Sequence, residues 1–243
     1  MVDMVEGLSN KFYIGLKHLG LSLSDQQLKQ FLRYQQELLD WNTRFNLTAI
    51  TDSEDVQIKH FLDSLSLLAV YDEPQAYLLD IGSGAGFPGL ALKIARPEWN
   101  VTLLEATGKK VTFLRHVIET LQLEGIVAVQ GRAEELGHQE AYRAKFDLVM
   151  ARAVASLSAL LEYSAPYCRV GGSIILPKKG DLVDELARGR RVAGQVGATL
   201  KADVVVEVPG LADGRRLLVW KQQKPCPTQY PRASAIMIKK PLG

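Results

Sequence analysis

The feature that most constrains the fold of this chain is a cluster of glycines directly after a short apolar run. Residues 77–81 are apolar apart from one acid, and four glycines follow within eight residues: Gly82, Gly84, Gly86 and Gly89. Glycine bends tightly and lets the backbone approach a ligand. Because the helix-like run 90–94 follows at once, the pattern predicts a strand, a ligand-binding turn and a helix of an open α/β sheet.

The region after residue 76 alternates short apolar runs with amphipathic stretches, which is typical of parallel βαβ units. Five runs are predicted strands: Tyr77–Ile81, Val101–Leu104, Ile126–Val129, Phe146–Met150 and Ser173–Leu176. Two further runs, 203–208 and 215–221, are separated by the Pro/Gly-containing stretch 209–214, so they are predicted to be antiparallel neighbours at a sheet edge. The Pro-punctuated tail from Gln222 is predicted to be extended.

The first 75 residues show helical patterns instead. Ser24 to Gln27 has the S-x-x-Q form of a capping box, and Thr51 to Glu54 repeats the signal as T-x-x-E. Apolar residues follow each signal at helical spacing. We therefore expect a helical N-terminal extension over residues 1–75 and a second domain over residues 76–243.

Composition and charge narrow the function classes. Hydrophobic residues make up 47% of the 243 residues, which is enough for a real core. The net charge of +2 combines an acidic N-terminal part with a basic C-terminal part. Residues 1–75 hold 6 Lys+Arg against 11 Asp+Glu, whereas residues 178–243 hold 13 Lys+Arg against 6 Asp+Glu. A basic end of this kind is either a solvated face or a surface that binds a polyanion.

Several classes of protein lack support in the sequence. No apolar stretch reaches the length of a membrane helix, and the first ten residues lack a signal pattern, so a cytoplasmic protein is predicted. The two cysteines are far apart and the four histidines have no zinc spacing, so no metal site is predicted.

The glycine turn can be interpreted in two registers. Gly84, Gly86 and Gly89 spell the dinucleotide pattern G-x-G-x-x-G, whereas the frame that starts at Asp80 spells D-x-G-x-G-x-G. An acid before the loop would repel a pyrophosphate but suits the cationic S-adenosylmethionine. The prediction is a class I S-adenosylmethionine-dependent methyltransferase fold, which is Rossmann-like, with a mostly parallel seven-stranded sheet and a reversed edge strand. A nicotinamide oxidoreductase is the alternative.

The loop after the fourth predicted strand limits the methyl acceptor. Residues 150–154 contain neither an N-P-P-Y run nor a Pro-Cys nucleophile. Guanine N7 is an acceptor that remains, because its free lone pair needs no deprotonation and catalysis would rest on alignment. His60, Asp63 and Ser64 share one predicted helix face, where we expect polar contacts rather than a hydrolytic triad.

The motifs together resemble one family, the bacterial small-subunit ribosomal RNA methyltransferase G, formerly glucose-inhibited division protein B. The matching stretches are Trp41-Asn42, residues 46–50, residues 60–65, residues 79–89, Glu105, Lys109-Lys110, residues 131–134 and Arg152-Ala153-Val154. The resemblance implies methylation of guanosine N7 in a 16S ribosomal RNA loop near the decoding centre, with S-adenosylmethionine as methyl donor. A ribosome-assembly factor that binds the donor without turnover is the alternative.

The resemblance also assigns roles to individual residues. It implies that the cofactor is bound by Gly82, Gly84, Phe87, Glu105, Ala133, Glu134 and Arg152. Within this set Glu105 would meet the ribose, Ala133-Glu134 the adenine, and Arg152, the one catalytic candidate, would position the substrate. The RNA-binding candidates are Lys178, Lys179, Lys239 and Lys240. The tail lacks the family's second arginine and Gly-x-Pro, and the protein is expected to act on 16S RNA or the small subunit as a monomer.

Overall fold

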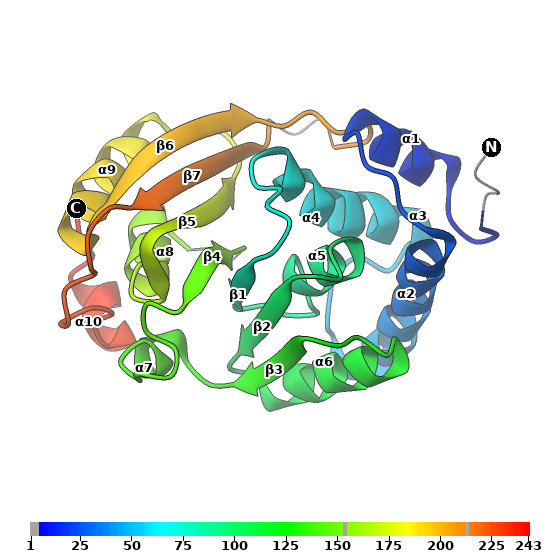
Figure 1. Cartoon of the computed structure of the whole chain (residues 1–243), viewed down its shortest axis with the longest axis horizontal. Helices are drawn as coiled ribbons and strands as arrows, with labels where there is room; N and C mark the ends of the chain where they lie inside the picture. The colour runs from blue at the N-terminus through cyan, green and yellow to red at the C-terminus, as the bar shows by residue number, and fades with distance from the viewer. Residues whose placement is uncertain (1–4, 153–154, 212–213) are drawn as a thin grey trace.

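The computed structural model describes residues 5–152, 155–211 and 214–243, and it forms an α/β sandwich around one sheet (Figure 1). Ala153 and Val154 of the quoted Arg-Ala-Val motif, and Ala212 and Asp213 of the predicted turn, lie outside the described residues. No helix in the described ranges is long and apolar enough to cross a membrane.

The sheet has seven strands in the order β3-β2-β1-β4-β5-β7-β6, as predicted for a class I methyltransferase fold. Their bounds are β1 Tyr77–Ile81, β2 Asn100–Glu105, β3 Ile126–Gln130, β4 Phe146–Ala151, β5 Cys168–Lys178, β6 Ala198–Val205 and β7 Arg216–Gln222. The first five strands pair in parallel, and β7 runs antiparallel to both β5 and β6. The reversed strand therefore lies one place in from the edge, which β6 forms, and β6 begins five residues earlier than the predicted run 203–208.

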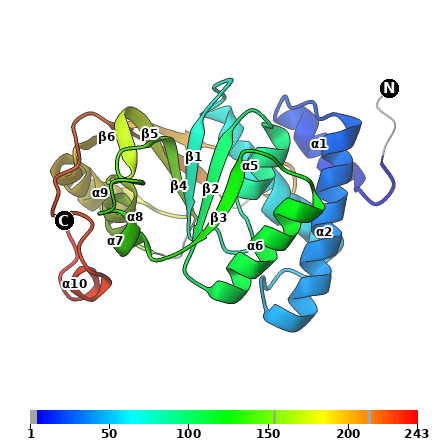
Figure 2. The same cartoon turned by 60° about the horizontal axis from the view of Figure 1, so that its bottom comes forward.

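Each face of the sheet has its own hydrophobic cluster, because successive strand residues point to opposite faces. Leu78 belongs to the cluster that includes residues of helices α5 (Gly89–Ala95) and α6 (Gly108–Thr120). The adjacent Leu79 belongs to the cluster on the other face, with residues of α7 (Ala133–Leu136), α8 (Leu157–Ser164) and α9 (Val183–Val196). The sheet is thus covered on both faces (Figure 2).

Helical segments before β1 pack onto the α5–α6 side, at the end of the molecule opposite the C-terminal helix (Figures 1 and 2). They are α1 Asn10–His18, α2 Asp25–Phe45, α3 Ser53–Val56, the π-helix η1 Gln57–Leu62, α4 Asp63–Leu65 and the 3₁₀-helix η2 Ser66–Ala69. The capping box at Ser24 is present as predicted. The predicted capping box at Thr51 is wrong by one residue. The N-cap of α3 is Asp52, whose side chain accepts from the Asp55 amide. The domain boundary at residue 75 stays a prediction.

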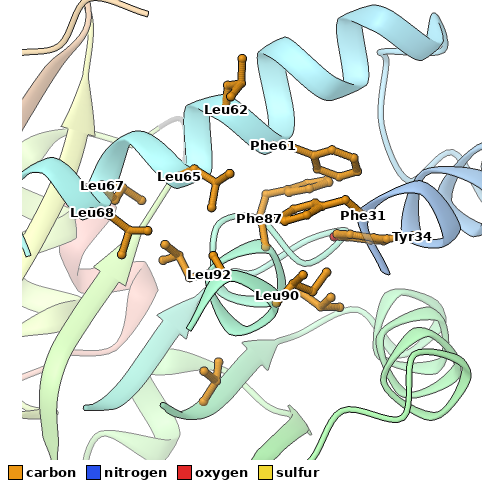
Figure 3. Packing of buried hydrophobic residues seen from close by; sticks show 14 of the residues in the cluster. Phe31, Tyr34, Phe61, Leu62, Leu65, Leu67, Leu68, Phe87, Leu90 and Leu92 are labelled. Carbon is orange, nitrogen blue, oxygen red and sulfur yellow. The ribbon is translucent and has the colours of Figure 1, made fainter. Parts of the chain in front are cut away.

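A chain of aromatic rings links these helices to the glycine turn. Tyr34 of α2 and Phe61 of the π-helix are stacked with centroids 5.3 Å apart, and Tyr34 stacks on Phe87 of the turn at 5.2 Å. Phe31 extends the group on the α2 side, 5.0 Å from Phe61 (Figure 3). Because all four rings are buried, the turn has a rigid apolar backing.

The expectation of an extended tail is wrong in one segment. Residues Ser234–Lys239 form a short helix, α10. The buried Glu162 of α8 accepts two bonds from the guanidinium of Arg232 and one from its backbone amide. Arg143 donates to four backbone carbonyls, three of which belong to residues 226–230. These contacts, rather than local sequence propensity, hold the tail against the α8 side of the molecule.

Candidate active site

The glycine turn after β1 adopts backbone conformations that require glycine. Gly82, Gly84 and Gly86 have φ values of +69°, +60° and +100°, a region that residues with a Cβ rarely adopt. A Cβ on Gly86 would lie 2.5 Å from the Tyr34 hydroxyl, which donates to the carbonyl of Ala85. A Cβ on Gly82 would instead meet no atom within 4 Å. The turn therefore packs against Tyr34 of α2 at Gly86, whereas Gly82 faces open space.

Glu105 joins this turn to the end of β2. Its carboxylate accepts from the amide of Gly84 at 3.0 Å and from the amide of Thr107 at 2.8 Å. The side chain is buried, yet a carboxylate has about four lone-pair positions. It therefore keeps acceptor capacity for the hydroxyl groups of a ribose.

A small cavity of about 110 Å³ lies beside the open glycine, at the carboxyl ends of β1, β2 and β3. Its lining residues are Ile81, Gly82, Leu104, Ala106, Gly131, Arg132, Ala133 and Glu134. The structure thus brings together three of the predicted cofactor residues, while Gly84 belongs to the same turn and its amide donates to Glu105. The lining is mostly apolar with one acid, Glu134, and one base, Arg132, which suits an adenosine, because its amino and hydroxyl groups donate hydrogen bonds and its ring nitrogens accept them.

Glu134 and Ala133 also have partners within the protein. The Glu134 carboxylate accepts from the hydroxyl of Ser234 at the start of α10, and the Ala133 carbonyl accepts from the Tyr167 hydroxyl at 2.7 Å. The loop expected at the adenine is therefore held by Tyr167, which immediately precedes β5, and by the tail, a connection that the sequence did not indicate.

Asp80 does not have the exposure that the predicted attraction to a cationic cofactor requires. Its side chain is fully buried, and Oδ2 accepts from the Gly89 amide at 2.9 Å. This bond gives a partner to the first backbone amide of α5. Oδ1 has no partner among the described residues. Burial raises the pKa of Asp80 to about 7, against the opposing effect of the Gly89 hydrogen bond. The acid thus shapes the turn from behind instead of contacting the ligand space.

A larger cavity of about 370 Å³ lies where β4 and β5 end and β7 begins. The residues around it are mostly cationic or apolar: Ile50, Lys59, His60, Asp63, Arg152, Pro177, Lys178, Lys179, Arg215 and Leu217. Three of the predicted residues, Arg152, Lys178 and Lys179, meet here. Lys239 and Lys240 lie at the exposed end of α10 and are not part of this lining.

One carboxylate joins two arginines from distant parts of the chain at this cavity. Asp63 Oδ2 pairs with Arg152 Nη1 at 2.7 Å, and Oδ1 pairs with Arg215. The Arg152 guanidinium also lies 5.4 Å from the centre of the Phe87 ring, so it touches both the glycine turn and the larger cavity. Sequence reasoning missed Asp63 and Arg215 as site residues. Their only signals were the His-x-x-Asp-Ser run and the Arg215-Arg216 pair.

His60 forms part of the same wall. Its ring stacks on Phe87 with centroids 4.4 Å apart and an interplanar angle of 14°, and Nε2 bonds with the Thr48 hydroxyl at 2.8 Å. The π-helix supplies His60 and runs directly into Asp63; such helical irregularities are frequent at functional sites. Burial, reinforced by the charges of Arg152 and Arg215, lowers the pKa of His60 to about 4.

The described contacts do not form a hydrolytic triad. Ser64 donates to the backbone carbonyl of His60, and Asp63 is paired with the arginines.

Lys178 pairs with Glu185 at 2.7 Å and donates to the Ala155 carbonyl, so its charge is shared with α9. Among the described residues, no group of His, Cys, Asp or Glu side chains is arranged to hold a metal ion.

Comparisons with known proteins identify the family of the chain. A profile of the family described as rRNA small subunit methyltransferase G matches residues 27–216. The Ribosomal RNA small subunit methyltransferase G of Dehalococcoides mccartyi strain CBDB1 is 47% identical over 233 residues, covering 96% of this chain and 99% of that protein. The protein of the same name from Roseiflexus sp. strain RS-1 is 45% identical, covering 92% and 95%.

A solved structure supports the fold alone. M. jannaschii TYW2 in complex with AdoMet superposes with a TM-score of 0.52 at 15% identity, over 67% of this chain and 76% of that one. The family match, together with the strand order, the reversed β7 and the glycine turn, identifies the protein as an S-adenosylmethionine-dependent methyltransferase rather than an oxidoreductase. Within that class, the chain belongs to the rRNA small subunit methyltransferase G family.

The buried Asp80 gives a test of the turn. Between the unfolded pKa of about 4 and the folded pKa of about 7, the folded state holds one proton more than the unfolded state. The stabilisation that protonated Asp80 gives the wild-type protein is therefore lost as pH rises through that window. We expect the free energy of unfolding of Asp80→Asn, relative to wild type, to rise from pH 4 to 7 and then level off in urea titrations. Exposed Asp184→Asn on α9 is the control, and a pH-independent difference would contradict the burial.

The state of His60 gives a second test. Its folded pKa of about 4 lies below the unfolded value of about 6.5, so its contribution to stability is present above pH 6.5 and is lost as pH falls toward 4. We expect one imidazole NMR resonance that is absent from His60→Phe to titrate near pH 4. A midpoint near 6.5 for that resonance would mean that the ring is exposed to solvent.

Proposed function

We propose that this protein transfers the methyl group of S-adenosylmethionine to N7 of a guanosine in 16S ribosomal RNA. The observation that carries the proposal is the position of Phe87. This residue belongs to the glycine turn of the cofactor fold, and it also contacts His60 and Arg152 of the larger cavity. A methyl donor held at the turn would therefore face an acceptor held in that cavity. Family membership supports RNA as the acceptor.

The described residues suit a reaction that rests on alignment. S-adenosylmethionine supplies an electrophilic methyl group on a sulfonium, and guanine N7 attacks it with its own lone pair, so no proton has to leave first. The site matches this demand, because His60 is neutral near pH 7 and both oxygens of Asp63 are paired with arginines. Neither side chain is set up as a strong base. Proximity and orientation are then the main catalytic contribution.

The cofactor roles follow the same arrangement. Gly82 and Gly84 provide close backbone approach, Glu105 accepts from the ribose, Ala133 and Glu134 border the adenine, and Phe87 and Arg152 border the methyl end. The carboxylate of Glu105 is held in one orientation by the Gly84 and Thr107 amides. Such preorganisation lowers the cost of binding.

The cationic rim of the larger cavity is proposed to hold the RNA backbone. Lys59, Lys178, Lys179 and the two arginines outnumber the single acid of the lining, and phosphate contacts set register without reading sequence. Lys239 and Lys240 are exposed on α10 and would make more distant contacts. We propose that the enzyme acts on the small subunit or its RNA, as a monomer in the cytoplasm.

Gly82→Asp is expected to abolish methyl transfer. The new side chain would enter the open space beside the turn, at a φ of +69° that disfavours any Cβ. The measurement is transfer of labelled methyl to unmodified 16S RNA and to small subunits, followed by nucleoside analysis for 7-methylguanosine. Gly20→Asp is a matched control, because Gly20 has a φ of +68° and open space but lies just after α1.

Three outcomes of that assay separate the alternatives. Label recovered as 7-methylguanosine with wild type and Gly20→Asp, but not with Gly82→Asp, supports the function and the site together. Cofactor binding without transfer to either substrate would favour an assembly factor that lacks turnover. Label on a different atom or nucleoside would refute the N7 assignment alone.

Replacing Lys178 and Lys179 by Ala is expected to weaken RNA binding and to flatten its salt dependence. Each lost phosphate contact lowers the slope of log K against log salt by roughly 0.7 to 0.9. Because Lys178 is also paired with Glu185, we expect a slope change nearer one contact than two. Lys17→Ala/Lys29→Ala removes two exposed charges on α1 and α2 as the control. Unchanged affinity at every salt concentration would refute a role for the lysine pair.

A further inference from the structure

The larger cavity has an unusual balance of hydrogen-bonding groups. Among its described lining residues, only Asp63 and His60 have side chains that accept hydrogen bonds, and the remaining ones are lysines, arginines or apolar residues. Asp63 is nearly buried, with 8% of its side chain exposed, and it is held in place by two arginines. A ligand group that donates hydrogen bonds and enters the cavity therefore has few side chains to bind.

Methylation at N7 restricts how a guanine can be recognised. The commonest protein contact to guanine is an arginine that donates to both O6 and N7. That contact would occupy the lone pair that must attack the methyl group, so it is incompatible with the reaction. The Watson–Crick edge leaves N7 free for the reaction: there O6 accepts a hydrogen bond, and N1–H and N2–H₂ donate.

The Asp63 cluster presents the complement of that edge. Its carboxylate has about four lone-pair positions, of which the described contacts with Arg152 and Arg215 use one on each oxygen. The remaining positions can accept from N1–H and N2–H₂, and a flanking guanidinium can donate to O6. Adenine offers a lone pair at N1 in place of a donor, so it would be repelled by the carboxylate.

His60 supplies a flat surface next to this cluster. One face of its ring lies on Phe87, and the residue lines the cavity. An uncharged ring in a stack with further aromatic rings behind it, Phe87 and Tyr34, is a suitable platform for a nucleobase, since bases stack on aromatic side chains in RNA complexes. The cavity volume of about 370 Å³ is in the range of small-molecule sites.

We propose that the larger cavity receives the guanine to be methylated, with the base stacked on His60 and its N1–H and N2–H₂ groups donating to Asp63. This assignment rests on the proposed function and adds to it the edge of the base that is read and the residue that reads it. Asp63 is then the specificity-determining residue, and the opposite edge of the base is left free so that N7 faces the glycine turn. Arg152 and Arg215 hold the carboxylate in position.

The test needs only the wild-type enzyme and three RNAs. The guanosine that wild type modifies is replaced by inosine, which lacks the N2 amino group, or by 7-deazaguanosine, which lacks N7. We expect inosine to lower kcat/KM by about tenfold and 7-deazaguanosine to abolish transfer. Equal kcat/KM for guanosine and inosine overturns the Asp63 assignment and leaves the proposed function intact. Transfer to 7-deazaguanosine, or no transfer to guanosine, overturns the proposed function and this assignment with it.

A variant separates direct reading from a structural role of Asp63. In Asp63→Asn the penalty for inosine should shrink to less than threefold, because the partner of the N2 amino group is weakened. Asp203→Asn is the matched control: Asp203 pairs with Arg216 at 2.6 Å outside the cavity, and it should keep the tenfold penalty. A full inosine penalty in soluble, folded Asp63→Asn overturns the assignment. If that variant does not fold, the wild-type comparison with inosine decides.

Discussion

The stacking of Phe87 between Tyr34 and His60 is the interaction on which the site depends. Phe87 belongs to the glycine turn, Tyr34 to α2 and His60 to the π-helix. Glycines alone would leave the turn mobile, because they add backbone freedom and no side-chain contacts. Each aromatic pair contributes about 0.5–1.5 kcal/mol beyond the burial of area. The stack therefore holds the turn in place and at the same time forms one wall of the larger cavity.

The helices before β1 are consequently part of the active site. They contribute Tyr34 behind the turn and His60 and Asp63 at the cavity, and they share one hydrophobic cluster with the sheet. The cavity would not exist if these helices were undocked. In the proposed function, the N-terminal region therefore completes the acceptor side of the site.

The buried charges of the site come at some cost in stability. Asp63 is the shared partner of Arg152 and Arg215, so its loss would remove the anion that both arginines contact, and breaking a buried ion pair costs about 3–5 kcal/mol. Asp80 and His60 add opposed pH dependences across the same window, since burial raises the pKa of the acid and lowers that of the base. Burial thus leaves His60 uncharged near pH 7, while the charges of Asp63, Arg152 and Arg215 are paired with one another.

The sequence by itself determined the local elements and the family. Glycine spacing after an apolar run located the turn, periodicity located most strands, and the Ser24 box located the start of α2, because these signals act over a few residues. Tertiary structure decided the rest. Asp80 is buried because β1 is covered on both faces and the residue packs against the start of α5; Asp52 rather than Thr51 capped α3; and the tail became helical on its anchors Glu162 and Arg143. Above all, the contacts of Asp63 with Arg152 and Arg215 join three distant segments, and no local pattern encodes a pairing that only the packing of the helices on the sheet creates.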